Sequence, residues 1–163
     1  MGKTRRAGGD DRALLNLWLT HLSRASHAHL QLDDDGICTI GHESGLDCAV
    51  ELPGNGSVYL RVAMFPWEPE TNPDLAERCL LASFMGIETG GAAFGVDPID
   101  VELVLWQERS VGSLDEAGFS RLVTQLFDNA VRLRKELGDA EAAAKRDTAH
   151  ERRPPLDFSM RRV

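Results

Sequence analysis

Two stretches in the middle of the chain alternate between apolar and polar residues, and this period of two constrains the fold more than any other feature. Successive side chains of a β-strand point to opposite faces, so each stretch has one apolar face. Antiparallel strands that pack one face on a core and turn the other to water show this pattern. The apolar series are Leu46, Cys48, Val50 and Leu52 in the first stretch, and Val58, Leu60, Val62 and Met64 in the second.

Three more short strands are predicted on either side of this pair. One covers 37–40 and follows the turn signal Asp33–Gly36. The other two, 92–96 and 101–108, form a hairpin that turns at 97–100. We therefore expect a sheet of five antiparallel strands.

Three helices are predicted around these strands. The first covers 11–26, and its leucines and tryptophan span an arc of about 200°, twice the stripe that a surface helix needs. The second covers 73–85, from Pro73 in its first turn to the stop signal Gly86, and is apolar in nearly every direction. The third starts at Ser113, the first residue of a Ser-x-x-Glu capping box, and has a one-sided apolar stripe.

The element order is therefore α-β-β-β-α-β-β-α, an α+β fold in which helices flank an antiparallel twisted sheet. We expect a flexible N-terminus over 1–10, one folded domain over 11–137, and a flexible charged tail over 138–163. The net charge of the 163 residues is −8, but 1–12 carry +2 and the tail +1, so −11 belongs to the body.

These charges and the hydropathy exclude several classes of function. An acidic body lacks the basic face that a nucleic-acid partner needs. No apolar run approaches the roughly 20 residues of a membrane span, and the N-terminus has no apolar signal region. Three cysteines without a Cys-x-x-Cys pair fit a reducing compartment. We expect a cytoplasmic protein that neither inserts into membranes nor binds nucleic acid.

Three patterns could carry chemistry, and none has the spacing that its chemistry needs. A group of histidines beside Cys38 lacks the further ligands that complete a metal site. The run Asp33–Asp35 lacks the loop pattern of a calcium site and is interpreted as a solvated turn. Cys38 and His42 share a strand face, so a reactive dyad is an alternative. The histidines are His21, His27, His29 and His42.

The sequence therefore predicts no catalytic, cofactor-binding or metal-binding residue, and we expect a protein that is not an enzyme. Apolar surface, by contrast, exceeds what one folded unit can bury. The wide first helix, the second helix and the Val104 and Trp106 side of the last strand all contribute. This excess indicates an obligate dimer with an additional partner surface.

The order and spacing of several stretches resemble a known family over residues 13–137. They are Leu30-x-Leu32-Asp-x-x-Gly36-x-Cys38-x-Ile40, Gly56-Ser-Val-Tyr-Leu-Arg-Val-Ala-Met64, Leu80-Leu-Ala-Ser-Phe-Met-Gly86, Gly91-Ala-Ala-Phe-Gly-Val-Asp-Pro98 and Val101-Glu-Leu-Val-Leu105. Together with the leucine-rich first helix and the amphipathic last one, they resemble the class I chaperones of bacterial type III secretion, the Tir chaperone (CesT-like) family.

The resemblance implies a cytoplasmic homodimer without enzymatic activity. It implies that each dimer binds the N-terminal chaperone-binding segment of a secreted effector or regulator in extended form, with a strand often added to a sheet edge. The client is kept partly unfolded until it reaches the secretion apparatus and its ATPase. A protein-binding adaptor or regulator of the same fold, outside effector secretion, is the alternative.

Two sets of residues follow from the apolar excess and the resemblance. Family dimers often pair through the second helix, which here implies a dimer interface of Leu75, Arg78, Leu81, Ala82, Phe84 and Met85. The expected effector-binding residues lie on the first helix and the last strand, namely Leu15, Trp18, Leu19, Leu22, Val104 and Trp106.

Overall fold

The alternating stretches form neighbouring strands of one antiparallel sheet, as their period predicts. The structure, a computed structural model, describes residues 9–26, 28–68, 70 and 73–151. The strands are β1 (Ile37–Gly41), β2 (Asp47–Glu51), β3 (Ser57–Pro66), β4 (Ala93–Asp97) and β5 (Glu102–Ser110). The helices are α1 (Gly9–Ser26), α2 (Pro73–Ala82) and α3 (Glu116–Glu151), with short 3-10 turns η1 (Phe84–Gly86) and η2 (Val111–Ser113). The predicted α+β fold and element order are confirmed.

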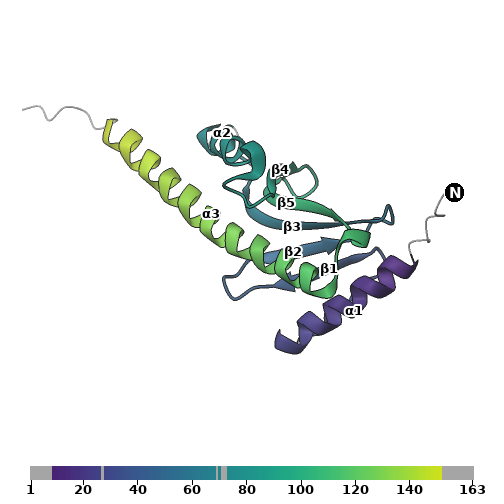
Figure 1. Ribbon diagram of the computed structural model, residues 1–163. Helices are drawn as coiled ribbons and strands as arrows, with labels where there is room; N and C mark the ends of the chain where they lie inside the picture. Colours follow the sequence, from purple (N-terminus) through teal and green to yellow (C-terminus); the bar gives the residue numbers. More distant parts are fainter. Residues whose placement is uncertain (1–8, 27, 69, 71–72, 152–163) are drawn as a thin grey trace, which may run out of the picture.

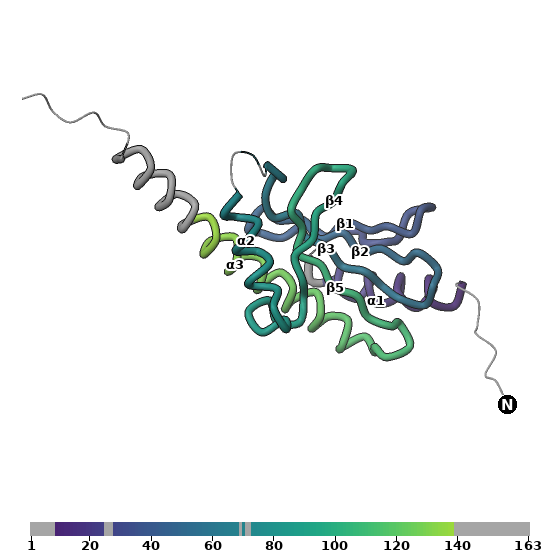
Figure 2. Tube along the Cα trace, turned by 90° about the horizontal axis from the view of Figure 1, so that it is seen from above, coloured from purple at the N-terminus to yellow at the C-terminus, as the bar shows by residue number. Residues whose placement is uncertain are grey.

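The strand order in the sheet is β1-β2-β3-β5-β4, so β1 and β4 are the two edges. Every neighbouring pair is antiparallel. Figures 1 and 2 show α3 running across one face of the sheet, with α1 toward the β1 end and α2 toward the β4 end. The opposite face has no helix over it among the described residues; it is called the outer face below.

The core lies between the sheet and the helices. The apolar residues of the alternating stretches point inward, and each is less than a tenth exposed. The apolar stripe of α3 covers them, and Phe119 of α3 stacks on Trp18 of α1 with 5.6 Å between ring centroids. The stripe comprises Phe119, Leu122, Val123, Leu126, Phe127, Ala130, Leu133 and Leu137. Removing these side chains from water is the main stabilising contribution.

The second helix ends earlier than the sequence predicts. The helix expected over 73–85 stops at Ala82. The hydroxyl of Ser83 donates to the Cys79 carbonyl at 2.9 Å and accepts from the backbone N–H of Phe94 at 2.8 Å, which fixes the chain end against β4. Met85 then has a φ of 56°, a left-handed conformation that no helix contains.

The third helix has a different cap from the predicted one. It begins at Glu116, and the carboxylate of Asp115 accepts from the backbone N–H of Gly118 at 2.6 Å. Ser113 instead lies in η2, and its hydroxyl donates to the Ser110 carbonyl at 2.7 Å. The predicted Ser113 capping box is therefore wrong, because the chain makes one more turn before the helix starts.

The far end of α3 continues to Glu151, and Figure 1 shows it extending beyond the sheet. The domain boundary predicted at residue 137 stays a prediction. Residues 1–8 and 152–163, on which the predicted flexible ends largely fall, lie outside the described residues. No helix in the described part of the chain is long and apolar enough to cross a membrane.

The capping contact gives a stability prediction. Asp115→Ala removes the side-chain acceptor at the start of α3 and should lower the free energy of unfolding by about 1 kcal/mol. Ser113→Ala is the matched control and should cost clearly less, because Ser113 bonds one carbonyl outside the helix. Urea denaturation at one protein concentration, followed by circular dichroism, measures both. A larger loss for Ser113→Ala would favour the capping box instead.

Candidate functional site

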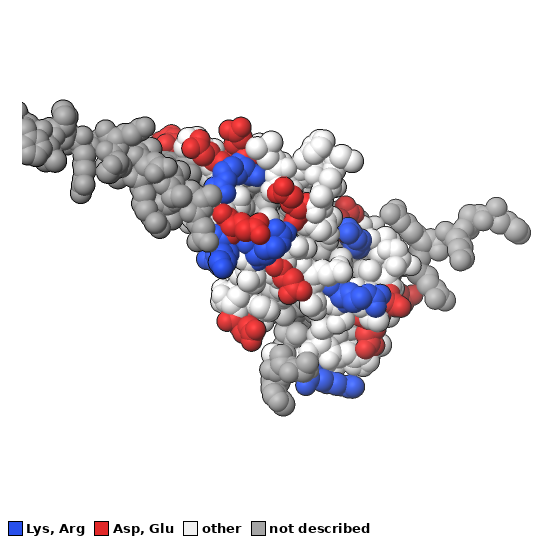
Figure 3. Space-filling view, turned by 60° about the vertical axis from the view of Figure 1, so that its left-hand side comes forward, with Lys and Arg blue, Asp and Glu red and all other residues white. Residues whose placement is uncertain are grey.

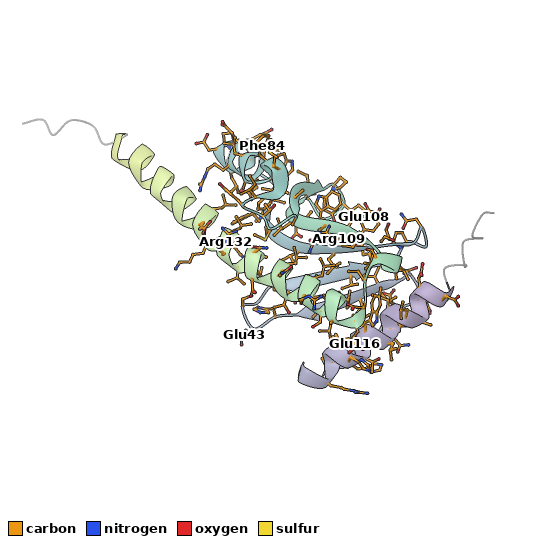
Figure 4. All side chains as sticks on the ribbon, in the orientation of Figure 1. Glu43, Phe84, Glu108, Arg109, Glu116 and Arg132 are labelled. Carbon is orange, nitrogen blue, oxygen red and sulfur yellow. The ribbon has the colours of Figure 1, made fainter. Side chains whose placement is uncertain are left out.

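The outward side of α2 and η1 carries a continuous series of exposed apolar residues, called the α2 patch below. Its members are between 66 % and 78 % exposed, and they are Leu80, Leu81, Phe84, Met85 and Ile87. Figure 4 shows Phe84 at this end of the molecule, and Figure 3 shows the left-hand side of Figure 1, where charged groups of both signs are interspersed with uncharged surface. Exposed apolar side chains gathered in this way are typical of protein contact surfaces.

The residues predicted for a dimer interface divide between this patch and the interior. Leu81, Phe84 and Met85 belong to the α2 patch. Leu75 and Ala82 are buried in the core of their own chain. Leu80 and Ile87 were missed by sequence reasoning, although the apolar run from Leu80 to Ile87 contained the signal.

Arg78, also predicted for the interface, binds within the chain. Its guanidinium donates to the carbonyls of Leu137 and Glu136 on α3, at 3.3 and 3.4 Å. These contacts hold α2 against α3. Arg78 therefore positions the helix that carries the α2 patch.

The first helix presents a groove rather than a flat apolar surface. Leu15 and Leu19 are fully buried and Trp18 is 4 % exposed, so these three predicted residues pack within the chain. Leu22 is half-buried and lines a groove of about 540 Å³ between α1 and the start of α3, called the α1–α3 groove below. Its lining consists of Trp18, His21, Leu22, Asp115, Glu116, Ala117 and Ser120.

Two polar residues of the groove lining contact each other. His21 Nδ1 lies 2.5 Å from a carboxylate oxygen of Glu116, which Figure 4 shows at the α1 end of α3. Leu14 and Leu17 are exposed on the same helix. They supply the spare apolar edge that the wide arc predicted, although they were not named among the effector-binding residues.

The outer face has a hollow of about 360 Å³ over β3, β4 and β5, called the outer-face hollow below. Val104 is 6 % exposed beneath it, whereas Trp106 is 36 % exposed at its surface. The indole of Trp106 lies across Gly95, where an added Cβ would stand 3.1 Å from the indole nitrogen. Tyr59 stacks beside it with 6.4 Å between ring centroids.

One arginine is fixed at the side of this hollow by two carboxylates. Arg61 donates to Glu51 at 2.5 Å and to Asp97 at 2.6 Å. The hydrogen bond with Glu51 raises the pKa of the Arg61 guanidinium. Backbone N–H groups of Ile99 and Asp100 lower the pKa of the Asp97 carboxyl, so the charges of Arg61 and Asp97 both persist at neutral pH.

The β1 edge has backbone groups available for another strand. The N–H of Leu52 donates to the Gly36 carbonyl, and the N–H of His42 donates to the Leu46 carbonyl. The even-numbered residues of the β1 segment therefore bond to β2. Ile37, Thr39 and Gly41 therefore point their backbone groups away from the sheet.

Asp33 occupies only the first of these positions. Its backbone N–H donates to the Ile37 carbonyl at 2.8 Å, and its carboxylate accepts from the Ile37 N–H at 2.9 Å. The N–H groups of Thr39 and Gly41, both exposed, have no partner within the described ranges. An edge of this kind is the usual template for strand addition.

The β4 edge is less accessible. The outward N–H of Phe94 is already bonded to Ser83, and α2 packs against the strand. The backbone N–H of Val96, two residues further along β4, points outward like that of Phe94, and Val96 is exposed. The two edges therefore differ, with β1 the more open.

The patterns considered for chemistry separate in space. His21 pairs with Glu116, His29 contacts Gln31, and His42 stacks on Phe127 at 4.7 Å. His27 lies outside the described residues. No three His, Cys, Asp or Glu side chains of the described chain come together as a metal site.

The Asp33–Asp35 run is a hydrogen-bonded turn, since Asp33 caps the N–H groups of Asp35 and Ile37. Burial raises the pKa of the Cys38 thiol. The Nδ1 of His42 meets the hydroxyl of Ser44 at 2.8 Å. Cys38 is therefore not set up to form a thiolate, and this contact of the His42 ring is with Ser44 and not with Cys38.

Residues 17–134 match the Tir chaperone protein (CesT) family, and the chain therefore belongs to this family. The resemblance seen in the sequence is confirmed. No curated protein sequence matches the chain closely enough to count as a relative.

Solved structures with the same fold include chaperone complexes. The ExsC–ExsE complex matches with a TM-score of 0.65 at 16 % identity, covering 77 % of this chain and 95 % of that one. The HopA1–SchA chaperone–effector complex matches with 0.62 at 18 %, covering 77 % and 97 %. YbjN of E. coli, a candidate transcription regulator, matches with 0.55 at 16 %, covering 78 % and 90 %.

Cysteine burial gives a prediction on reactivity. Burial raises the pKa of Cys79 to about 11 and that of Cys48 to about 12. At about pH 8.5 less than about 1 % of either thiol is ionised, so iodoacetamide should label both at least about tenfold more slowly in native protein than in urea. The native rate should rise with pH, because the thiolate fraction rises. Mass spectrometry of timed samples measures this.

The same experiment tests the dyad. His42→Gln should leave the native labelling rate of Cys38 unchanged within about twofold. Rapid native labelling of Cys38 that His42→Gln slows would revive a reactive pair.

Proposed function

We propose that this protein is a cytoplasmic, non-enzymatic chaperone that binds the N-terminal segment of a type III secretion effector or regulator in extended form. The observation that carries the proposal is an open β1 edge, with an apolar groove on the neighbouring helix, in a fold of the CesT family. The solved HopA1–SchA complex, a chaperone bound to its effector, has the same fold and supports it.

The client adds a short strand to β1. Its backbone bonds to the free groups of Thr39 and Gly41, while alternate side chains select the partner. The α1–α3 groove takes apolar client side chains against Leu22. Trp18 also lines this groove, whereas Leu15 and Leu19 are fully buried and support α1 from the core. Because a client held in this way stays extended, it stays competent for secretion.

Two chains pair through the α2 patch. The patch is apolar, exposed and located at the β4 end of the sheet, away from the β1 edge. Leu81, Phe84 and Met85 are its central residues. The dimer presents the client to the secretion apparatus and its ATPase.

A second candidate is a protein-binding adaptor or regulator of the same fold outside effector secretion. The similarity to YbjN supports this candidate, because YbjN has the same fold and is described as a candidate transcription regulator. The two functions differ in the bound chain. Capture by the tagged protein from its native bacterium, followed by identification, should return a secreted protein whose export falls when the chaperone gene is deleted; a retained regulator would favour the adaptor.

The strand-addition site predicts a selective effect of proline. Thr39→Pro removes an outward N–H and fills the place of the client carbonyl, so affinity for the captured client's N-terminal segment should fall about tenfold or more. Since Thr39 does not bond to β2, the sheet itself loses no hydrogen bond. Fluorescence anisotropy with the labelled segment measures the affinity.

The matched control is Val96→Pro, which removes an outward N–H from the β4 edge instead. It should weaken client affinity clearly less than Thr39→Pro does. If Val96→Pro weakens binding and Thr39→Pro does not, the client binds at β4. If neither matters while the segment still binds, strand addition is wrong.

Dimerisation gives a second prediction. The wild-type protein should have a mass near twice 17.9 kDa by light scattering. Leu81→Glu or Phe84→Glu should reduce it to the single-chain mass, because the interface would bury an unpaired carboxylate. Leu17→Glu, on exposed surface of α1, is the control and should keep the dimer. A well-folded wild-type monomer at micromolar concentration would contradict the proposed pairing.

A further inference from the structure

The outer-face hollow combines an exposed aromatic ring with a rigid support. Trp106 and Leu105 are adjacent in β5 and point to opposite faces of the sheet, so Trp106 cannot pack in the core. Its indole lies across Gly95 instead. Tyr59 supports its side, and Ile99 at the rim is 86 % exposed. A flat aromatic face presented in this way attracts a cation, while an apolar rim can cover the methylene stem of a long basic side chain.

The charge on this face is strongly one-sided. Strand residues of alternate register share the face with Trp106, and Arg61 is the one basic residue among them. The acidic residues of that face are Asp47, Glu51, Asp97, Glu102 and Glu108. Asp100 adds another carboxylate at the turn, 3.9 Å from Arg61.

Arg61, which lines the hollow itself, offsets only part of this excess. Its one positive charge is shared among Glu51, Asp97 and Asp100, so the group keeps a net negative charge, and the described strands supply no second cation for the remaining carboxylates of the face. A second copy of the chain offers this acidic face less charge complementarity than a basic client residue does, because its own residues 13–137 carry −11.

We propose that the outer-face hollow binds an arginine or lysine side chain of the client polypeptide, with the cation over the Trp106 indole and the surrounding carboxylates attracting it. The inference rests on the proposed function and adds to it a requirement on the client: a basic residue in the part of the segment that crosses the outer face.

A model peptide tests the hollow independently of the natural client. The probe is an acetylated, amidated heptapeptide of alternating glycine and serine with one central arginine, and its control replaces arginine by the uncharged isostere citrulline. The indole N–H signal of Trp106 in a ¹⁵N–¹H spectrum, assigned with Trp106→Phe, reports binding. Trp18 and Trp67 are internal references.

The arginine peptide should shift the Trp106 signal until the site is saturated. Its affinity should be at least about fivefold higher than that of the citrulline peptide. Added salt should weaken the affinity further. Gly95→Ala should weaken it too, because the new Cβ displaces the indole while the backbone φ at this position suits any residue. Asp100→Asn, at an exposed carboxylate, should weaken it about two- to threefold.

Equal affinities for the two peptides would overturn the inference. So would equal shifts of Trp18 and Trp67, or a Trp106 shift that follows protein concentration alone, which would assign the hollow to a second copy. The natural client separates this inference from the proposed function. If its segment binds equally well after every arginine and lysine is replaced by glutamine, the hollow's role is wrong and the chaperone function stands.

Discussion

The helices of the described chain cover only one face of the five-stranded sheet, and most features of the surface follow from that constraint. The apolar stripe of α3 packs on β3 and β5 in the middle of the sheet. α1 and α2 close the two ends of the same face. Nothing in the described ranges lies over the outer face, so its residues meet solvent or another chain. The acidic outer face, the α2 patch and the β1 edge are all surfaces that this arrangement leaves without a partner in the chain.

The two ends of the sheet differ in how their edge strands are bonded. At the β4 end, Ser83 bonds to the strand and Arg78 fixes α2 to α3, so the patch on α2 is presented by a rigid support. At the β1 end, Asp33 covers the start of the strand and leaves the rest open. A dimer formed at the first end therefore directs both open edges outward, where one client could contact each in turn.

The sequence predicted the elements well and their surroundings less well. Strand alternation and helix periodicity are local properties, so element order and the five strands could be predicted without knowledge of packing. Contacts between distant residues could not. Ser83 ends α2 through Phe94, and the α3 carbonyls engage Arg78; both partners are remote in sequence. The first helix shows the same limit of sequence-based prediction. Its wide apolar arc predicted spare apolar surface, but it could not show that Leu15 and Leu19 would face the core.

The shortness of the free β1 edge has a mechanical consequence. Among the described residues of β1, only Thr39 and Gly41 have outward N–H groups without a partner, so a client strand added there would be held by a few hydrogen bonds, each worth about 1 kcal/mol. Contacts of this kind, spread along an extended chain, break one after another when the chain is pulled from one end. The work of removal is then divided into small steps, and a motor that threads an unfolded chain can peel the client away without unfolding its carrier.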